Sequence, residues 1–123
     1  MKKIDTIIEA RIGSKRLPGK VMYKINGIPI IELLVNRVKK VKSAGRIIIA
    51  TSINKLDDEI IKWAKKKRVL FYRGNEEDVM SRVLNAAKYY KVKHILNITG
   101  DCPLIDPQLI SQFINIYNSN NCE

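Results

Sequence analysis

Short apolar runs alternate along the chain with stretches in which apolar positions recur every three or four residues. The run "KIDTIIEA" (3–10) is brief, apolar and rich in β-branched residues, which is typical of a buried strand. The runs "RIIIATS" (46–52), "VLFYRG" (69–74) and "HILNITG" (94–100) have the same character. We therefore expect four strands, each covered on both faces.

The stretches between these runs have the spacing of one apolar helix face. Ile31, Leu34 and Val35 begin the first such face. Four helices are expected: one that follows Pro29 and stops at Gly45, one at 56–67, one at 75–91 with Asn75 as its N-cap, and one capped by Asp106 with Pro107 in its first turn.

Four βα units in succession predict an α/β fold, in which a mostly parallel sheet lies between two layers of helices. The length of 123 residues suits one domain. We assign residues 1–117 to a nucleotide-binding α/β domain and 118–123, "NSNNCE", to a polar tail that frays. The last strand is expected to leave an open sheet edge.

Composition narrows the possible partners only moderately. The net charge of +11, from 23 Lys and Arg against 12 Asp and Glu, favours anionic partners, although solvated lysines on helix faces would give the same surplus. No apolar run approaches the ~20 residues of a membrane span, and the start "MKKIDTIIEAR" has no apolar export segment. We expect a cytoplasmic protein, in which Cys102 and Cys122 stay reduced.

Two loops that bear polar groups are predicted at the same edge of the sheet. Ligands of open α/β sheets bind beyond the carboxyl ends of the strands. The loop "RIGSKRLPGK" (11–20) follows the first strand, and "TGDCP" (99–103), which includes Asp101, follows the fourth. We expect these two loops to converge.

The first loop fits neither of the two familiar phosphate-binding motifs. Five residues separate Gly13 from Gly19, where a P-loop has four, and Val21 stands where a P-loop has Ser or Thr. The loop is also too long for a dinucleotide fingerprint, and Pro18 interrupts it.

What remains is a basic loop whose cations and small residues suit a triphosphate: Arg11, Gly13, Ser14, Lys15, Arg16 and Lys20. A carboxylate such as Asp101 would be repelled by those phosphates unless a hard cation such as Mg²⁺ lay between them. The alternatives are a solvated basic turn and an aspartate that only caps a turn.

Three segments resemble the cytidylyltransferases that make CMP-activated sugars. "ARIGSKRLPGK", "RGNEEDVMSR" and "ITGDCPLIDP" are similar to signatures of the spore coat polysaccharide branch of that family, and the resemblance covers residues 4–117. Members are about twice as long, so the chain corresponds to their N-terminal half. The resemblance implies a truncated Rossmann-like nucleotidyltransferase fold of the glycosyltransferase-A type, a three-layer α/β/α sandwich.

The resemblance also implies an activity, in which CMP is transferred from CTP to a sugar or sugar phosphate and pyrophosphate is released. Arg16, Lys20 and Asp101 would be catalytic, and Asp101 would bind Mg²⁺. The implied nucleotide-binding residues are Ala10, Arg11, Gly13, Ser14, Lys15, Arg73, Gly74, Thr99 and Gly100. His94 begins the fourth strand, at the end away from this site, and is expected to be structural.

Two other functions stay open at this point. The family's second half normally supplies a further acidic metal ligand, much of the acceptor pocket and a dimerisation arm, so the chain could be a catalytically silent nucleotide-binding module. A basic nucleic-acid-binding domain is disfavoured, because the aromatic residues lie mostly within predicted helices and strands. We expect CTP and a sugar acceptor as partners, together with a homodimer, and neither nucleic acid nor membrane.

Overall fold

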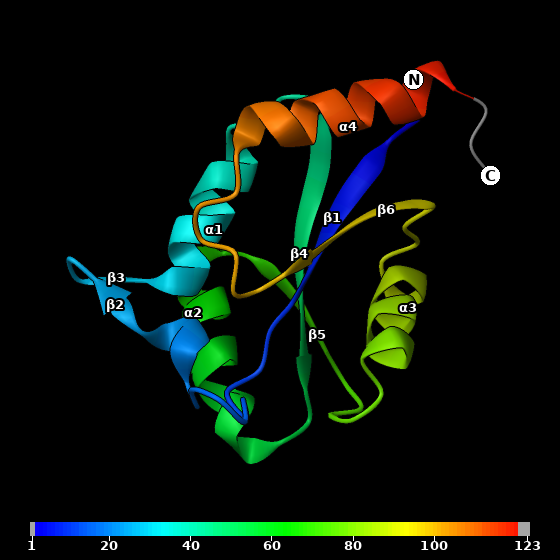
Figure 1. Ribbon diagram of the computed structural model, residues 1–123. Helices are drawn as coiled ribbons and strands as arrows, with labels where there is room; N and C mark the ends of the chain where they lie inside the picture. The colour runs from blue at the N-terminus through cyan, green and yellow to red at the C-terminus, as the bar shows by residue number, and fades with distance from the viewer. Residues whose placement is uncertain (1, 121–123) are drawn as a thin grey trace.

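The computed structural model, which describes residues 2–120, is built on a four-stranded parallel sheet (Figure 1). The strands are β1 (Ile4–Glu9), β4 (Ala44–Ser52), β5 (Leu70–Gly74) and β6 (His94–Thr99). Their order across the sheet is β5-β4-β1-β6, so the first strand of the chain lies inside the sheet. The predicted parallel sheet is confirmed, and β6 is the expected edge strand.

Four helices follow the strands in the predicted alternation. They are α1 (Ile30–Lys39), α2 (Asp58–Lys67), α3 (Val79–Tyr89) and α4 (Pro107–Ser119), with short 3-10 turns η1 (Lys20–Met22) and η2 (Lys55–Asp57). The predicted Asp106 cap of α4 is confirmed, since its side chain accepts a hydrogen bond from the Gln108 amide. Arg68 ends α2 in the left-handed conformation.

The helices form layers on both faces of the sheet, as the sandwich architecture requires. Buried side chains of α1, α2 and α4, such as Leu34, Ile60 and Ile114, pack with Ile8 and Ile49 in one cluster. On the opposite face, α3 covers a smaller cluster, which comprises Ile7, Ile48, Ala50, Val83, Ala86 and Ala87. Figure 1 shows α1 and α2 on one side of the strands and α3 on the other.

A two-stranded hairpin between η1 and α1 was not predicted. Strand β2 (Lys24–Ile25) pairs antiparallel with β3 (Ile28–Pro29). The turn between them is Asn26-Gly27, and both residues have positive φ, which matches the right-handed twist of a hairpin.

Several predicted boundaries were wrong. Helix α3 begins at Val79 with Asp78 as its N-cap, because Asn75 instead accepts hydrogen bonds from the Glu77 and Asp78 amides in a turn. Gly45 does not stop α1, which ends at Lys39, but lies within β4. Helix α4 continues to Ser119, so the tail predicted for 118–123 begins inside a helix; residues 121–123 lie outside the described part.

The expectation that every strand is covered on both faces was wrong for β6. Ile95, Asn97 and Thr99 of this strand are exposed, whereas Ile98 is buried. Helix α3 packs against β1, β4 and β5 and leaves that side of the edge strand open.

Within residues 2–120, no helix combines the length and the apolar character needed to cross a membrane. Cys102 is an exposed free thiol. Cys122 falls outside the described residues.

Candidate nucleotide site

A buried carboxylate holds the first loop against the end of β4. Asp57, which is only 1% exposed, accepts a hydrogen bond at 2.7 Å from the Ile12 amide. Its second oxygen accepts hydrogen bonds from the amide and the hydroxyl of Ser52, the last residue of β4. The loop after β1 is therefore fixed to the neighbouring strand by a charged acceptor, which makes stronger hydrogen bonds than a neutral one.

The same loop closes on itself through Ile12. The carbonyl oxygen of Ile12 accepts hydrogen bonds from the Ser14 and Gly19 amides, both at 2.8 Å. Gly19 has φ of 75°, which favours glycine, and it leads directly into η1. Because of this closure, Lys15, Arg16 and Leu17 form an exposed tip, while Lys20 returns to the sheet edge.

The carboxyl ends of β1 and β6 meet closely at Gly100. Its amide donates to the Glu9 carbonyl at 2.7 Å. A Cβ at this position would come within 2.8 Å of that same oxygen and 3.0 Å of the Ala10 side chain, so only glycine allows this approach. The predicted convergence of the two loops is confirmed, with Asp101 following directly.

A pocket of about 420 Å³ opens where these loops meet. Its lining combines predicted nucleotide-binding residues with four others: Glu9, Ala10, Arg11, Ser14, Lys15, Arg16, Lys20, Val21, Val79, Arg82, Thr99, Gly100 and Asp101. All four loop cations line it. The cations and the acid therefore face one shared space, as a polyphosphate site requires.

Lys20 and Asp101 form an ion pair across this pocket, with 3.1 Å between Lys20 Nζ and Asp101 Oδ2. Hydrogen bonding from Lys20, followed by that from Thr99, holds the pKa of Asp101 below its usual value. The carboxylate is thus charged well below neutral pH. Both side chains stay partly exposed, so each can exchange its partner for a ligand.

Arg82 is a buried cation in this lining that sequence reasoning missed. The residue is 2% exposed, and its Nη1 donates to the carbonyl oxygens of Asn75 (3.1 Å) and Glu76 (3.2 Å). Its Nε makes no hydrogen bond to any described residue. Burial lowers the pKa of Arg82, against the opposing effect of carboxylates such as Glu9, but a guanidinium stays charged at neutral pH.

Three of the predicted nucleotide-binding residues are absent from the lining. Arg73 is used structurally, since its guanidinium donates to Asp58 Oδ1 (2.7 Å) and to the carbonyls of Ser52 and Asn54. Gly74 packs against the Arg82 side chain, where a Cβ would come within 3.1 Å of Arg82 Cγ. Gly13 lies beside Glu76. A nucleotide contact of these three residues stays a prediction.

Glu76 connects three of the loops at this edge. Its carboxylate lies 3.6 Å from Arg11 Nη1 and accepts a hydrogen bond at 2.8 Å from Asn54. Residues from the loops after β1, β4 and β5 therefore share one acid, and one of them, Arg11, also lines the pocket.

The acidic side chains of the pocket suit a metal cation that takes most of its ligands from phosphate oxygens and water. Among residues 2–120, no three His, Cys, Asp or Glu side chains gather into a metal cluster. Mg²⁺ is commonly held by one or two carboxylates together with phosphate oxygens and water. Asp101 alone, or with Glu9 of the same lining, provides such a set.

The prediction for His94 is confirmed. It lies at the amino end of β6, outside this lining, and its Nδ1 shares a hydrogen bond of 2.8 Å with the Tyr117 hydroxyl.

Several known proteins are similar to this chain over nearly its whole length. Over 119 residues the chain is 43% identical to an uncharacterised protein of Methanocaldococcus jannaschii, covering 97% of this chain and 49% of that protein. It is 35% identical to the spore coat polysaccharide biosynthesis protein SpsF of Bacillus subtilis, with coverage of 95% and 50%. The chain thus spans about half the length of the curated relatives it matches.

A solved structure has the same architecture. A cytidylyltransferase from Leptospira borgpetersenii superposes with a TM-score of 0.92 at 34% identity, covering 98% of this chain and 51% of that one. The predicted nucleotidyltransferase fold is therefore confirmed. The family model described as cytidylyltransferase matches residues 6–123. The chain accordingly belongs to the cytidylyltransferase family, as its three motifs predict.

Proposed function

We propose that this chain binds CTP and provides the nucleotide half of an enzyme that transfers CMP to a sugar or sugar phosphate, with release of pyrophosphate. The observation that carries the proposal is the shared pocket, in which four loop cations face Asp101 across the ends of β1 and β6. Family membership supports the choice of CTP. The similarity to a polysaccharide biosynthesis protein supports a sugar acceptor, and use of CTP supports a cytoplasmic location.

Binding of the triphosphate would rearrange the ion pair between Lys20 and Asp101. Phosphate oxygens offer Lys20 a more highly charged partner than a single carboxylate, so the ammonium group would turn toward them. Arg16 and Lys15, at the exposed tip of the loop, would close on the phosphates from the solvent side. Arg82 would add fixed positive charge from the floor of the pocket.

In the transfer step, an oxygen of the acceptor forms a bond to the α-phosphorus of CTP as the bond from that phosphorus to the bridging oxygen breaks. Pyrophosphate leaves with the bonding electrons, and a hydroxyl acceptor releases its proton to solvent. Arg16 and Lys20 stabilise the negative charge on the leaving group. The loop anchored by Asp57 keeps those cations in position, which contributes through orientation.

Mg²⁺ is the cofactor that Asp101 would hold, and it would neutralise charge on the phosphate oxygens. Once Lys20 has turned toward the phosphates, Asp101 would be an unpaired carboxylate, the kind of oxygen ligand that a hard cation prefers.

A catalytically silent nucleotide-binding module is the second candidate, because the chain covers only half of its relatives. Such a module would bind CTP in the same way but would release no pyrophosphate.

Titration calorimetry with CTP, with and without Mg²⁺, tests binding. We expect uptake of CTP with Mg²⁺, and affinity at least about tenfold weaker in Arg16→Ala and Asp101→Ala, since each removes a charge-assisted contact. Lys42→Ala is the matched control, since Lys42 is an exposed cation that does not line the pocket. Pyrophosphate release with candidate sugars then separates an enzyme from a silent binder.

The proposal fails if no nucleoside triphosphate binds. It also fails if single-stranded DNA binds as tightly as CTP and Lys42→Ala weakens binding as much as Arg16→Ala. That pattern would point to a diffuse response to polyanions.

A further inference from the structure

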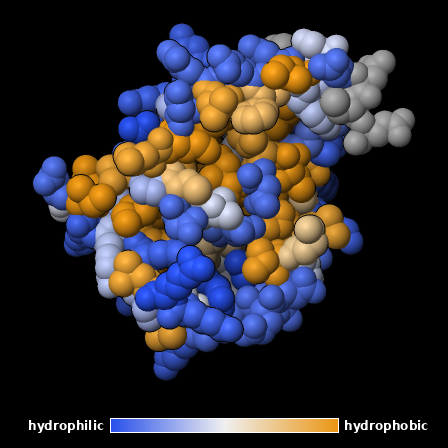
Figure 2. All heavy atoms as spheres, in the orientation of Figure 1, coloured by the Kyte–Doolittle hydropathy of each residue, from blue (hydrophilic) through white to orange (hydrophobic). Residues whose placement is uncertain are grey.

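A second pocket, of about 410 Å³, lies at the end of the sheet opposite the nucleotide pocket. It is formed where β1, β4 and β6 begin, and we call it the amino-end pocket; its lining residues are Lys2, Lys3, Asp5, Arg46, Lys91, Lys93 and His94. The length of β1, roughly 17 Å, separates the two pockets. Figure 2 shows hydrophilic residues at the lower end of the molecule, where β1 ends in Figure 1, and again along the upper rim, where β1 begins.

The floor of the amino-end pocket is held in place by Asp5 and Arg46. Asp5 is 2% exposed and accepts hydrogen bonds from Arg46 Nε (3.3 Å) and Nη2 (2.9 Å), and Nη2 also donates to the Tyr90 carbonyl oxygen (2.9 Å). A Cβ on Gly45 would overlap the Asp5 carboxylate and lie 3.0 Å from the Ile4 carbonyl oxygen, so glycine is needed for this packing. Among residues 2–120, none of the hydrogen bonds of the Arg46 side chain uses Nη1. The guanidinium group is therefore positioned by the protein, with one end able to donate to a ligand.

The lysines of this pocket have little compensation from acids. The lining contains five cations against one carboxylate, and that carboxylate, Asp5, is already paired with Arg46. Among residues 2–120, Lys3, Lys91 and Lys93 form no ion pair. Like charges gathered in this way raise the free energy of the folded chain, and a bound anion would lower it.

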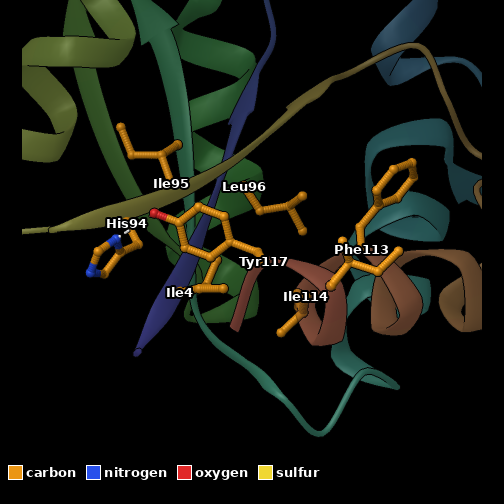
Figure 3. Close-up of a pocket in the computed structure, with 8 residues that line it drawn as sticks. Ile4, His94, Ile95, Leu96, Phe113, Ile114 and Tyr117 are labelled. Carbon is orange, nitrogen blue, oxygen red and sulfur yellow. Dashed lines mark hydrogen bonds between the residues drawn. The ribbon is translucent and has the colours of Figure 1, made fainter. Parts of the chain in front are cut away.

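The rim of the pocket is ordered by local contacts. Lys2 Nζ lies 4.7 Å from the centre of the Tyr117 ring, and Figure 3 shows the Tyr117 hydroxyl beside the His94 ring, with which it shares a hydrogen bond of 2.8 Å. Lys91 has a φ of 55°, a left-handed conformation that glycine adopts with less strain. The turn before β6 therefore carries a cation at a position where the backbone favours glycine.

The lining indicates a small, highly charged ligand without an apolar part. None of its described residues is aliphatic, and its one aromatic ring, that of His94, packs edge-on against Tyr117, so a nucleotide base or an acyl chain would find little apolar contact. The cations come from three separate segments, 2–3, 46 and 91–93. A ligand with two or more anionic groups would contact several of these cations at once, whereas a single phosphate would reach fewer.

We propose that the amino-end pocket is a second anion site, which binds a small ligand of two or three linked phosphate groups, such as pyrophosphate. The juxtaposition that carries the proposal is the fixed Arg46 guanidinium surrounded by lysines without acid partners. Pyrophosphate is also the product that the proposed transfer would release. The site is nevertheless separate from the nucleotide pocket and does not require that the chain bind CTP.

NMR titration of the chain with sodium pyrophosphate, without Mg²⁺, tests the proposal. The chain contains one histidine, so the ring signals of His94 report on this pocket without ambiguity. We expect these signals and the amide signals of residues 91–94 to follow one saturating curve, with a Kd below about 1 mM in low salt. Inorganic phosphate should bind at least about tenfold more weakly, because it offers fewer charged oxygens.

The double variant Lys91→Gly, Lys93→Ala removes two cations from the rim. Glycine suits the φ of 55° at position 91, so the turn should keep its shape. The affinity measured at His94 should fall at least about fivefold. Lys42→Ala is the matched control, because Lys42 is an exposed cation before β4, at the same end of the sheet, that does not line the pocket; its affinity should stay within about twofold of the wild type.

The amide signals of residues 11–20 separate this proposal from the proposed function. Pyrophosphate would also enter the nucleotide pocket, where Arg16→Ala should weaken its binding and leave the curve at His94 unchanged. Movement at residues 91–94 in a chain that does not bind CTP would support the second site and overturn the proposed function. CTP binding without any movement at residues 91–94 would do the reverse.

Three further results would overturn the proposal. The double variant and Lys42→Ala weaken binding equally, which would indicate a diffuse response to polyanions; inorganic phosphate binds as tightly as pyrophosphate, which would exclude a preference for linked phosphates; or Arg16→Ala weakens binding at His94 as much as at residues 11–20, which would show one site rather than two.

Discussion

Two buried aspartates, Asp5 and Asp57, hold β4 to segments at opposite ends of β1, and they do so differently. Asp5 is 2% exposed and Asp57 is 1% exposed. Asp5 accepts hydrogen bonds from the Arg46 amide (2.6 Å) and from Arg46 Nη2 (2.9 Å), so its partner is a cation. Among residues 2–120, Asp57 accepts only from amides and a hydroxyl, those of Ile12 and Ser52.

Because of this difference, Asp5 stabilises the sheet itself, whereas Asp57 stabilises the loop that lines the pocket. The contact between Asp5 and Arg46 joins strand to strand, and Arg46 also donates to the Tyr90 carbonyl at the end of α3. Asp57 instead joins a strand to the loop that lines the pocket. Substitution of Asp5 should therefore affect stability alone, whereas substitution of Asp57 should affect stability and nucleotide binding together.

The largest effect is expected for Asp57→Ala. The Ile12 amide and both donors of Ser52 would lose a charged acceptor in a buried place, so we expect the free energy of unfolding to fall by about 3 kcal/mol. The loop would also loosen, and CTP affinity should drop at least about tenfold at a temperature where the variant is folded. Urea unfolding and calorimetry measure the two quantities. Unchanged affinity in a folded variant would show that the loop holds its shape without Asp57.

A smaller loss is expected for Asp5→Asn, about 1.5–3 kcal/mol at neutral pH, with CTP affinity unchanged. Burial acts to raise the pKa of Asp5, but hydrogen bonds from Arg46 outweigh it and the pKa lies below the usual value. The stabilisation is therefore present above the unfolded pKa of about 3.9 and is lost as pH falls through the lower folded pKa.

Urea unfolding of both proteins between pH 7 and pH 2 checks this dependence. The difference between wild type and Asp5→Asn should stay constant down to about pH 4 and shrink below it. A difference that grew on acidification would contradict the sign. If Asp5→Asn lost as much CTP affinity as Asp57→Ala, the expectation that Asp5 affects stability alone would be wrong.

The smallest effect on stability is expected for a change beside the partly exposed Asp101. Lys20→Met should return the pKa of Asp101 toward its ordinary value, because Lys20 is the main cause of the lowering, while stability changes by less than about 1 kcal/mol. NMR titration of the Asp101 carboxyl measures the shift, with Lys15→Met as the control. If the pKa does not move, Thr99 rather than Lys20 sets it.

Much of the fold could be predicted because the strong signals are local. Buried strands and helix faces leave their periodicity in the sequence, and the strand ends then place Asp101 opposite the first loop. The hairpin was missed although Asn26-Gly27 is a strong turn signal, since its strands have only two residues each.

The buried roles of Asp57 and Arg82 were not predicted, and the reason differs between the two residues. Asp57 stands in "LDDE", where acids at a helix start are ordinary, and only the tertiary structure shows which of them is buried. Arg82 did leave a signal. It lies on the apolar face of α3 between Val79 and Val83, where a cation is unexpected unless it has a buried role.

The position of β1 inside the sheet has a consequence for synthesis on the ribosome. The strand made first pairs on one side with β4 and on the other with β6, in a register that joins Ile4 to His94 and Glu9 to Thr99. Residues 4–9 must therefore wait until residues 94–99 have been made before both edges of β1 are filled. Nascent chains that end before about residue 99 should therefore depend on chaperones that shield the unpaired edge of β1.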